Sequence, residues 1–333
     1  MRSVLAATVV LVQLGVVYAQ CPGSVTASVC GLSKASYPDW MGRLPNDRLI
    51  SDLSIPATHD SLAIVGGSLT QCQENYGQSA DTLTAQLKAG IRGFDIRLRI
   101  AEGNKFTIHH GPTYQNANFD DVLTKLRSFL EANPTETVLI RAKRECRNEF
   151  LSCNDAPGDF ESIFRSYVSA YPTVFWAPAV NGRADIPRLG DVRGKAVLMV
   201  LHGNSGGPYG AFGLHHFAGW TDGSTTYVQD DYNVANTGAI ATKRDKVRRF
   251  LDVTSAGDKS KIYVNFGSGS SILAHPFTIA NGAAPSTTGV NPFLLGYMRE
   301  GPEVHAPVVR TGVMMLDFPG ADLITQIINT NQV

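Results

Sequence analysis

The first residues with the potential for chemistry are His59 and Asp60, which close the run Leu53-Ser54-Ile55-Pro56-Ala57-Thr58-His59-Asp60-Ser61. This run predicts a strand and a turn that deliver an imidazole and a carboxylate together at a strand end, where barrels place catalytic groups. Taken alone, the pair also fits a histidine that hydrogen-bonds a loop and an aspartate that caps a helix. Further groups must therefore decide its role.

A second set of polar residues lies on the strand expected from Gly93 to Ile100. Asp95 and Arg97 share one face of this strand with Arg99, and the opposite face is apolar: Phe94, Ile96, Leu98, Ile100. In an open surface sheet the charged face would simply be the solvated one. Between strands and helices it indicates a barrel with a polar lumen that leads to a site.

A third candidate is the strand Phe106 to Pro112, which contains His109 and His110. Adjacent residues of a strand point to opposite faces, so only one of these histidines can share the lumen with Arg97, and the other is structural. Two histidines and an arginine are what phosphodiester cleavage requires. They supply a base for the nucleophile, an acid for the leaving oxygen and a fixed positive charge for the phosphate.

The elements that must position these groups alternate between short apolar strands and amphipathic helices. Asn118 is a candidate N-cap for a helix that ends before Pro134, and a second helix is expected from Phe160 to Val168. Further strands are expected at Thr137 to Ala142, Ala196 to Leu201, Lys261 to Phe266 and Gly312 to Phe318. With no repeat or long linker, the pattern favours a single α/β domain. We predict a TIM-like (β/α) barrel that is irregular or incompletely closed.

The N-terminus predicts export. Met1 and Arg2 precede an apolar run and the small-residue ending Val17-Tyr18-Ala19, which fits a secretory signal over residues 1–19 and a mature catalytic barrel over 20–333. A membrane anchor is the alternative, but the run is short for spanning a bilayer. We therefore expect a secreted, extracellular protein.

Charge and cysteine content limit the partners. Without the signal the formal net charge is −1, which gives no reason to invoke nucleic acid. The five cysteines are compatible with disulfides in an exported chain, and Cys146 and Cys153 are close enough to staple a local loop. The other three, Cys21, Cys30 and Cys72, allow three alternative pairings. No spacing resembles a zinc site.

Taken in order, the motifs resemble the catalytic X region of phosphatidylinositol-specific phospholipases C. The resemblance is carried by Ser54 to Ser61, Gly93-Phe94-Asp95-Ile96-Arg97, His110-Gly111-Pro112 and Asn133 to Val138. Weaker similarity continues through Leu189 to Lys195, Val228 to Tyr232 and Met315 to Phe318. It thus covers roughly Leu49 to Phe318, and its first half is the more specific.

The resemblance implies roles for five catalytic residues. His59 would take the proton of the inositol 2-hydroxyl, which attacks phosphorus, and Asp317 would orient His59 and balance its charge. His110 would protonate the diacylglycerol leaving oxygen, with Asp60 coupled to that transfer. Arg97 would hold the phosphate oxygens. The implied product is an inositol 1,2-cyclic phosphate, formed by a monomer acting peripherally on a phosphatidylinositol-type lipid at a membrane surface.

The resemblance also bears on metal and head group. Calcium-dependent relatives place carboxylates and an asparagine around the phosphate, whereas Arg97 matches the bacterial, metal-independent branch, so we expect no metal and no cofactor. The implied substrate-binding residues are Asp95, Lys143, Asp230 and Tyr232. Bacterial members carry basic residues on the strand that here runs Ala196 to His202, and this departure could alter the preferred head group, for example to a glycosylated phosphatidylinositol.

Two other functions remain open from the sequence. One is a phosphodiesterase of similar shape, such as a glycerophosphodiesterase, whose carboxylate metal cluster Arg97 argues against. The other is a binding module for inositol lipids or glycans without turnover. Two segments could touch lipid: aromatic residues of a glycine-rich segment, or a basic helix face that is otherwise simply solvated. The aromatic residues are Tyr209, Phe212 and Trp220, and the basic residues are Lys243, Arg244, Lys246, Arg248 and Arg249.

Overall fold

The computed structural model describes residues 28–66, 79–145, 154–202, 212–220, 222–283 and 287–332. The predicted signal over 1–19 lies outside these residues. Cys30 is disulfide-bonded, but the other four cysteines also lie outside them, so the pairing stays a prediction. Within the described residues no helix is long and apolar enough to cross a membrane.

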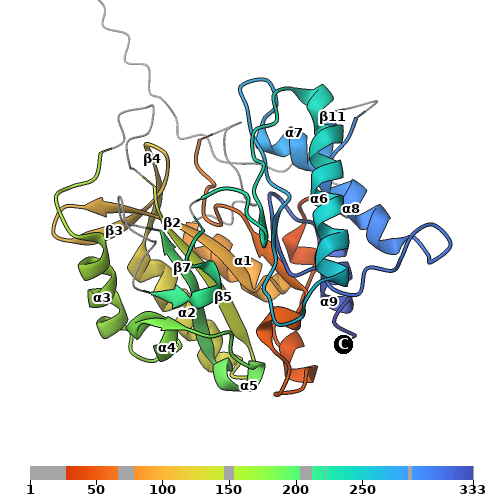
Figure 1. Ribbon diagram of the computed structural model, residues 1–333. Helices are drawn as coiled ribbons and strands as arrows, with labels where there is room; N and C mark the ends of the chain where they lie inside the picture. Colours follow the sequence, from red (N-terminus) through yellow and green to blue (C-terminus); the bar gives the residue numbers. More distant parts are fainter. Residues whose placement is uncertain are drawn as a thin grey trace, which may run out of the picture.

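Eleven strands of the described chain form one curled sheet, drawn at the centre of Figure 1. The strand order is β6-β8-β7-β5-β2-β1-β13-β10-β9, and β3 and β4 form a hairpin attached to β2. All pairings from β7 through to β9 along this order are parallel. The bounds are β1 Ile55–Thr58, β2 Gly93–Ala101, β3 Lys105–His110, β4 Thr113–Asn118, β5 Thr137–Arg144, β6 Arg183–Ala184, β7 Lys195–His202, β8 Gly213–Leu214, β9 Val228–Gln229, β10 Val264–Phe266 and β13 Val313–Leu316.

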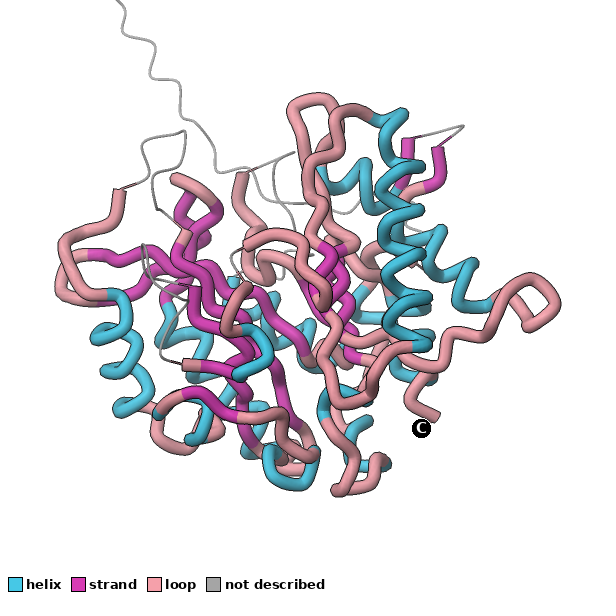
Figure 2. Tube along the Cα trace, in the orientation of Figure 1, coloured by secondary structure: helices cyan, strands magenta, loops and turns pink. Residues whose placement is uncertain are grey.

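Helices flank the strands on both sides of the view, as the cyan and magenta segments of Figure 2 show. A separate small pair, β11 Gly282–Ala283 and β12 Thr287–Thr288, lies beside them. The helices are α1 Ser79–Ala89, α2 Phe119–Ala132, α3 Phe160–Ala170, α4 Ala177–Asn181, α5 Leu189–Val192, α6 Ile240–Ala256, α7 Pro276–Asn281, α8 Val290–Arg299 and α9 Ala321–Asn329. As predicted, Asn118 precedes α2, and its backbone N–H donates to Asp121 at 2.8 Å.

The predicted alternation along β2 is confirmed. Its apolar face is completely buried against the helices, and every member of this face is 0% exposed: Phe94, Ile96, Leu98, Ile100. The other face carries Asp95 and Arg97 into the lumen. A regular (β/α) barrel fills its lumen with branched aliphatic side chains, so a charged lumen marks this one as a site.

The barrel is incompletely closed, as the sequence predicted. Among the described residues no strand pairing joins β9 to the other end of the sheet, and no α-helix lies between β7 and β9. Trp220 lies across this seam, with its ring 4.9 Å from that of His202 on β7 and 6.2 Å from that of Phe266 on β10. Aromatic packing therefore occupies the place of strand pairing.

Candidate active site

The parallel register brings the chemical groups into rows across the sheet. Thr58 pairs with Leu316, so the next residues of these two strands, His59 and Asp317, are neighbours at the carboxyl ends of β1 and β13. The His59 N–H donates to the Leu316 carbonyl at 3.1 Å and fixes this register. Two residues separated by 258 positions thus meet because their strands are adjacent.

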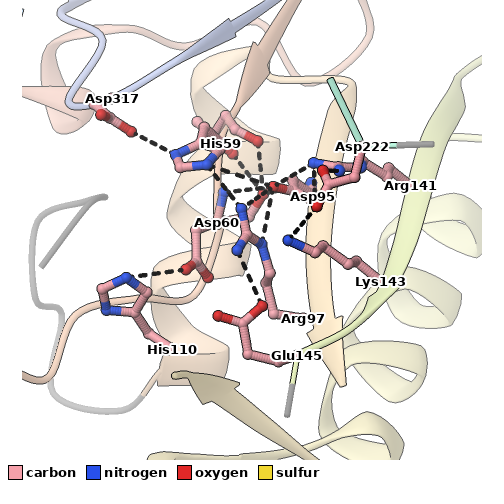
Figure 3. Close-up of polar contacts among 12 residues, drawn as sticks. His59, Asp60, Asp95, Arg97, His110, Arg141, Lys143, Glu145, Asp222 and Asp317 are labelled. Atoms are coloured by element: carbon pink, nitrogen blue, oxygen red, sulfur yellow. Dashed lines mark hydrogen bonds and ion pairs between the residues drawn. The ribbon is translucent and has the colours of Figure 1, made fainter. Parts of the chain in front are cut away.

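His59 is held from both sides of its ring, as Figure 3 shows. Its Nδ1 lies 3.0 Å from Asp317 Oδ1, and its Nε2 lies 2.8 Å from Arg97 Nη2. Because a guanidinium N–H can only donate, Nε2 must carry the lone pair and Nδ1 the proton. Burial, reinforced by the charge of Arg97, holds the pKa of His59 well below its ordinary value. The imidazole is therefore neutral and presents a basic nitrogen to the lumen.

Arg97 is the cation at the centre of the site. Its Nε and Nη2 donate to Asp95 Oδ2 at 3.2 Å, and its Nη1 donates to Glu145 Oε2 at 3.0 Å. Burial opposes the charge, but Glu145 and Asp95 raise the pKa of Arg97 well above its ordinary value. The guanidinium remains charged and fixed in its plane, which suits it to bind phosphate oxygens.

His110 and Asp60 form a second acid–base pair. His110 Nε2 lies 4.0 Å from Asp60 Oδ2, and neither carboxylate oxygen of Asp60 accepts a hydrogen bond within the described residues. Burial lowers the pKa of His110 to about 4 and raises the pKa of Asp60 well above its ordinary value. Asp60 also adopts a left-handed backbone with φ of 38°, which is strained for a residue other than glycine.

The prediction about adjacent histidines is confirmed. His110 turns toward Asp60, whereas His109 is 3% exposed and packs its ring 5.6 Å from that of Tyr114 on β4. The strand end at His110 thus contributes one histidine to the site and one to the packing of the hairpin.

Asp95 is buried beneath the site. Its side chain is 0% exposed, and Oδ2 accepts from Arg97 and from the backbone N–H of Asp60 at 3.1 Å. Burial alone would raise the pKa of Asp95, but Arg97 and Arg141 hold it well below its ordinary value. This carboxylate contacts Arg97 and the turn at Asp60, and the substrate-binding role that we predicted for it stays a prediction.

Two further basic side chains, Arg141 and Lys143, reach the site from β5. Arg141 is 1% exposed, donates from Nη1 to Asp95 at 3.4 Å and pairs with Asp222. Lys143 Nζ lies 2.7 Å from Asp222 Oδ2. Lys143 therefore lies at the site as predicted, with its charge already paired.

The remaining predicted positions are less integrated. Asp230 is partly buried, and burial raises its pKa against the opposing charge of Arg141. Tyr232 is 61% exposed at the rim.

The aromatic segment considered for lipid contact is buried where the structure describes it, whereas the basic run is buried only at Lys243 and keeps Lys246 and Arg249 exposed. Phe212 and Trp220 are 0% and 2% exposed, so they pack rather than touch lipid, and Tyr209 lies outside the described residues. In the basic run, Lys243 is 2% exposed and donates to the Asp231 carbonyl at 2.9 Å. Arg244 lies over the ring of Phe293.

Three residues at the site had no predicted role: Arg141, Glu145 and Asp222. Arg141, Lys143 and Glu145 alternate along β5 and its end, and this period of two could have shown that they share a face. Asp222 gives no such signal, because it lies in an irregular glycine-rich segment. Within the described residues, no group of three or more His, Cys, Asp or Glu is placed to hold a metal ion.

Comparison with known proteins identifies the family. The model of the phosphatidylinositol-specific phospholipase C X domain matches residues 53–201. A 1-phosphatidylinositol phosphodiesterase of Listeria monocytogenes is 30% identical over 295 residues, which cover 88% of this chain and 84% of the relative. The chain belongs to the phosphatidylinositol-specific phospholipase C X-domain family.

Other relatives agree in extent. The 1-phosphatidylinositol phosphodiesterase of Staphylococcus aureus strain Newman is 26% identical and covers 90% of this chain and 96% of its own length. The solved phospholipase C of Listeria monocytogenes has a TM-score of 0.68 at 25% identity and covers 90% of this chain and 100% of its own. A Staphylococcus aureus enzyme, solved in work on its membrane binding, has a TM-score of 0.69 at 23% identity and covers 91% and 99%.

We predicted a departure from the bacterial pattern of this family on the strand Ala196 to His202, which lies within β7. This strand ends at His202. Burial lowers the pKa of His202 to about 3, so its ring carries no positive charge at neutral pH. Arg141 on the neighbouring strand lies beside it, with Nε 3.4 Å from His202 Nδ1. In addition to Arg97 on β2, the described site therefore has a buried cation on β5, Arg141, and a neutral ring on β7.

Proposed function

We propose that this protein is a secreted, metal-independent phospholipase C that cleaves phosphatidylinositol, or a glycosylated form of it, to diacylglycerol and inositol 1,2-cyclic phosphate. The observation that carries the proposal is the neutral His59, whose basic nitrogen lies 2.8 Å from the guanidinium of Arg97. A hydroxyl that attacks a neighbouring phosphate requires a base to accept its proton and a fixed cation beside it to bind the phosphate oxygens.

The first step uses His59 and Arg97. When the substrate binds, its phosphate oxygens accept hydrogen bonds from Arg97 Nη2, which donates to His59 in the free protein. The lone pair on His59 Nε2 then becomes available. His59 then accepts the proton of the inositol 2-hydroxyl while its oxygen bonds to phosphorus. Asp317 keeps Nδ1 protonated and stabilises the imidazolium that forms.

The second half of the reaction uses His110 and Asp60. The bond from phosphorus to the glycerol oxygen breaks, and that oxygen receives a proton from the pair, so the products are a neutral diacylglycerol and the cyclic phosphate monoanion. The pKa directions of the two groups place the proton of the free pair on Asp60, from which His110 relays it. The strained turn at Asp60 holds the carboxylate toward His110.

The deciding experiment measures cleavage of phosphatidylinositol vesicles by the purified protein in excess chelator, with phosphorus NMR to identify the product. We expect the cyclic phosphate, and a loss of about two to four orders of magnitude in His59→Ala and His110→Ala. His109→Ala is the matched control, since its ring packs in the hairpin, and it should retain activity. Binding without cleavage would identify a binding module, and activity abolished by the chelator would indicate a metal-dependent phosphodiesterase.

We also propose that the site approaches a membrane through the loop after β10. Ile272 and Leu273 are 90% and 70% exposed, and this loop is tied to the rim at Tyr232, whose carbonyl accepts from the Ser270 N–H at 2.9 Å. Loops after parallel strands lie at the same end as the catalytic groups. Two exposed apolar side chains there suit a lipid surface.

Replacing Ile272 and Leu273 by serine should weaken vesicle binding roughly 10- to 100-fold, because each side chain contributes about 1.5–3 kcal/mol when buried in lipid and part of each remains in water. Cleavage of a monomeric soluble substrate should not change. Serine at Val304 and Val309, which are exposed on the loop before β13 at the opposite end of the strands, provides the control. Equal vesicle binding by both double variants would place the membrane contact elsewhere.

A further inference from the structure

Glu145 connects two parts of the site that lie on different strands. It follows β5 directly, is 3% exposed, and its backbone N–H donates to the Leu98 carbonyl of β2 at 2.9 Å. Oε2 accepts from Arg97 Nη1 at 3.0 Å, and Oε1 accepts from the Gly111 N–H at 2.9 Å. One carboxylate therefore contacts the cation at the centre of the site, as Figure 3 shows, and also the turn that follows His110.

The contact at Gly111 fixes where the turn begins. Gly111 has a left-handed backbone with φ of 51°, and His110 pairs with Thr113 across the hairpin. Within the described sheet the hairpin of β3 and β4 pairs only with β2, and Gln115 ties β4 to Val65 outside the catalytic groups. An anchor at the turn itself is therefore needed to hold His110 at a set distance from Asp60. The hydrogen bond from Gly111 supplies that anchor.

The need to neutralise the charge of Arg97 does not by itself explain why Glu145 contacts this guanidinium. Asp95 already accepts from both Nε and Nη2 of this guanidinium and is completely buried. The additional partner accepts from Nη1, which Asp95 does not contact, and it belongs to the residue that also holds the hairpin tip. Burial raises the pKa of Glu145, but the charges of Arg97 and Lys143 outweigh this effect and hold the pKa below its ordinary value. The carboxylate is therefore ionised.

We infer that Glu145 is a positioning residue that sets the distance between the phosphate clamp Arg97 and the general acid His110. The inference rests on the proposed function, since both roles belong to that reaction. The clamp and the acid act on opposite sides of the same phosphorus, and an error of about 1 Å between them costs on the order of 100-fold in rate.

A second consequence concerns the proton that His110 and Asp60 share. The charged or titratable groups that face His110 are His59 and Asp60 after β1, Arg97 on β2, Lys143 on β5 and Glu145 after β5. Glu145 raises the pKa of both His110 and Asp60, whereas Arg97 and Lys143 lower both. Removing the anion leaves the two cations unopposed there, so the acid loses its proton at a lower pH.

The test compares Glu145→Gln and Glu145→Asp with wild type on phosphatidylinositol over a range of pH. In Glu145→Gln we expect kcat to fall about 10- to 100-fold with little change in KM, and the alkaline limb of kcat/KM to move to lower pH. Aspartate keeps the charge but is too short for both contacts. Glu145→Asp should therefore lose kcat while its alkaline limb stays near that of wild type.

Glu136→Gln is the matched control. Glu136 is 0% exposed at the start of the same strand and pairs with Arg92 at 2.8 Å, so its loss disturbs a buried ion pair away from the site. We expect it to lower Tm without moving the pH profile. If Glu145→Gln lowers Tm and leaves kcat and the alkaline limb unchanged, Glu145 is structural and the inference fails. An inactive wild type would instead overturn the proposed function.

Discussion

The state of His59 follows from its neighbours alone. An arginine on one side and an aspartate on the other leave a single tautomer for the ring, with the proton on Nδ1 and the lone pair on Nε2. The direction of the pKa agrees, because the ring is buried beside a cation. A base prepared in this way needs no rearrangement before it accepts a proton.

Asp317→Asn tests this arrangement. The amide can turn its NH2 group toward Nδ1, which moves the ring proton to Nε2, where it opposes the N–H of Arg97. We expect a loss of about 10²- to 10⁴-fold in kcat with the fold intact. Activity within a few-fold of wild type, measured with Tm as a check on folding, would show that the tautomer is set by other groups.

At the scale of elements, strand order determines which residues meet. Along the chain, Asp317 is far from His59, and periodicity predicted both strands without indicating that they are adjacent. The family resemblance supplied that pairing, and the register explains it. By contrast, Arg97 and His110 could be predicted from alternation within single strands.

The contribution of Arg141, Glu145 and Asp222 could not be predicted in the same way. Arg141 reaches Asp95 because β5 lies beside β2, with the two residues directly paired. Asp222 joins them from an irregular segment with no periodic pattern. Side-chain period tells which face a residue occupies, but the contacts between faces require the order of the strands.

Close approach of β1 and β2 gives a testable result at this scale. A Cβ at Gly93 would lie 2.5 Å from Cβ of Ala57 and 3.3 Å from Cγ1 of Val313. Gly93→Ala should therefore lower the free energy of unfolding by about 1–3 kcal/mol and reduce kcat, because β1 carries His59 and Asp60. The control is Gly219→Ala, where an added Cβ meets nothing within 4 Å. Equal stabilities in denaturant would contradict the close packing.

For the molecule as a whole, the charged lumen links stability to pH. His202 is neutral when folded, with a pKa lowered to about 3 by burial beside Arg141. The unfolded chain binds a proton there below about pH 6.5, whereas the folded chain does not, so stability falls as the pH drops from 6.5 toward 3. At pH 5 this one group costs about 2 kcal/mol.

His202→Gln should reduce this dependence. Between pH 7 and pH 5, the variant should lose about 2 kcal/mol less in free energy of unfolding than wild type loses. The measurement is denaturant unfolding at both pH values, and His215→Gln, which removes an exposed histidine, serves as the control. Identical slopes for His202→Gln and wild type would show that this ring titrates normally in the folded protein.

The position of β1 between β2 and β13 also determines the order in which the sheet and the site are completed. During synthesis, β1 and β2 emerge early, and they can pair while the rest of the chain is still being made. The partner of His59 arrives 258 residues later, on the strand that fills the other side of β1. Until β13 joins, one edge of β1 is open and the base lacks its carboxylate. The growing chain therefore carries most of its barrel before it has a working base, and the last strand of the sheet completes both at once.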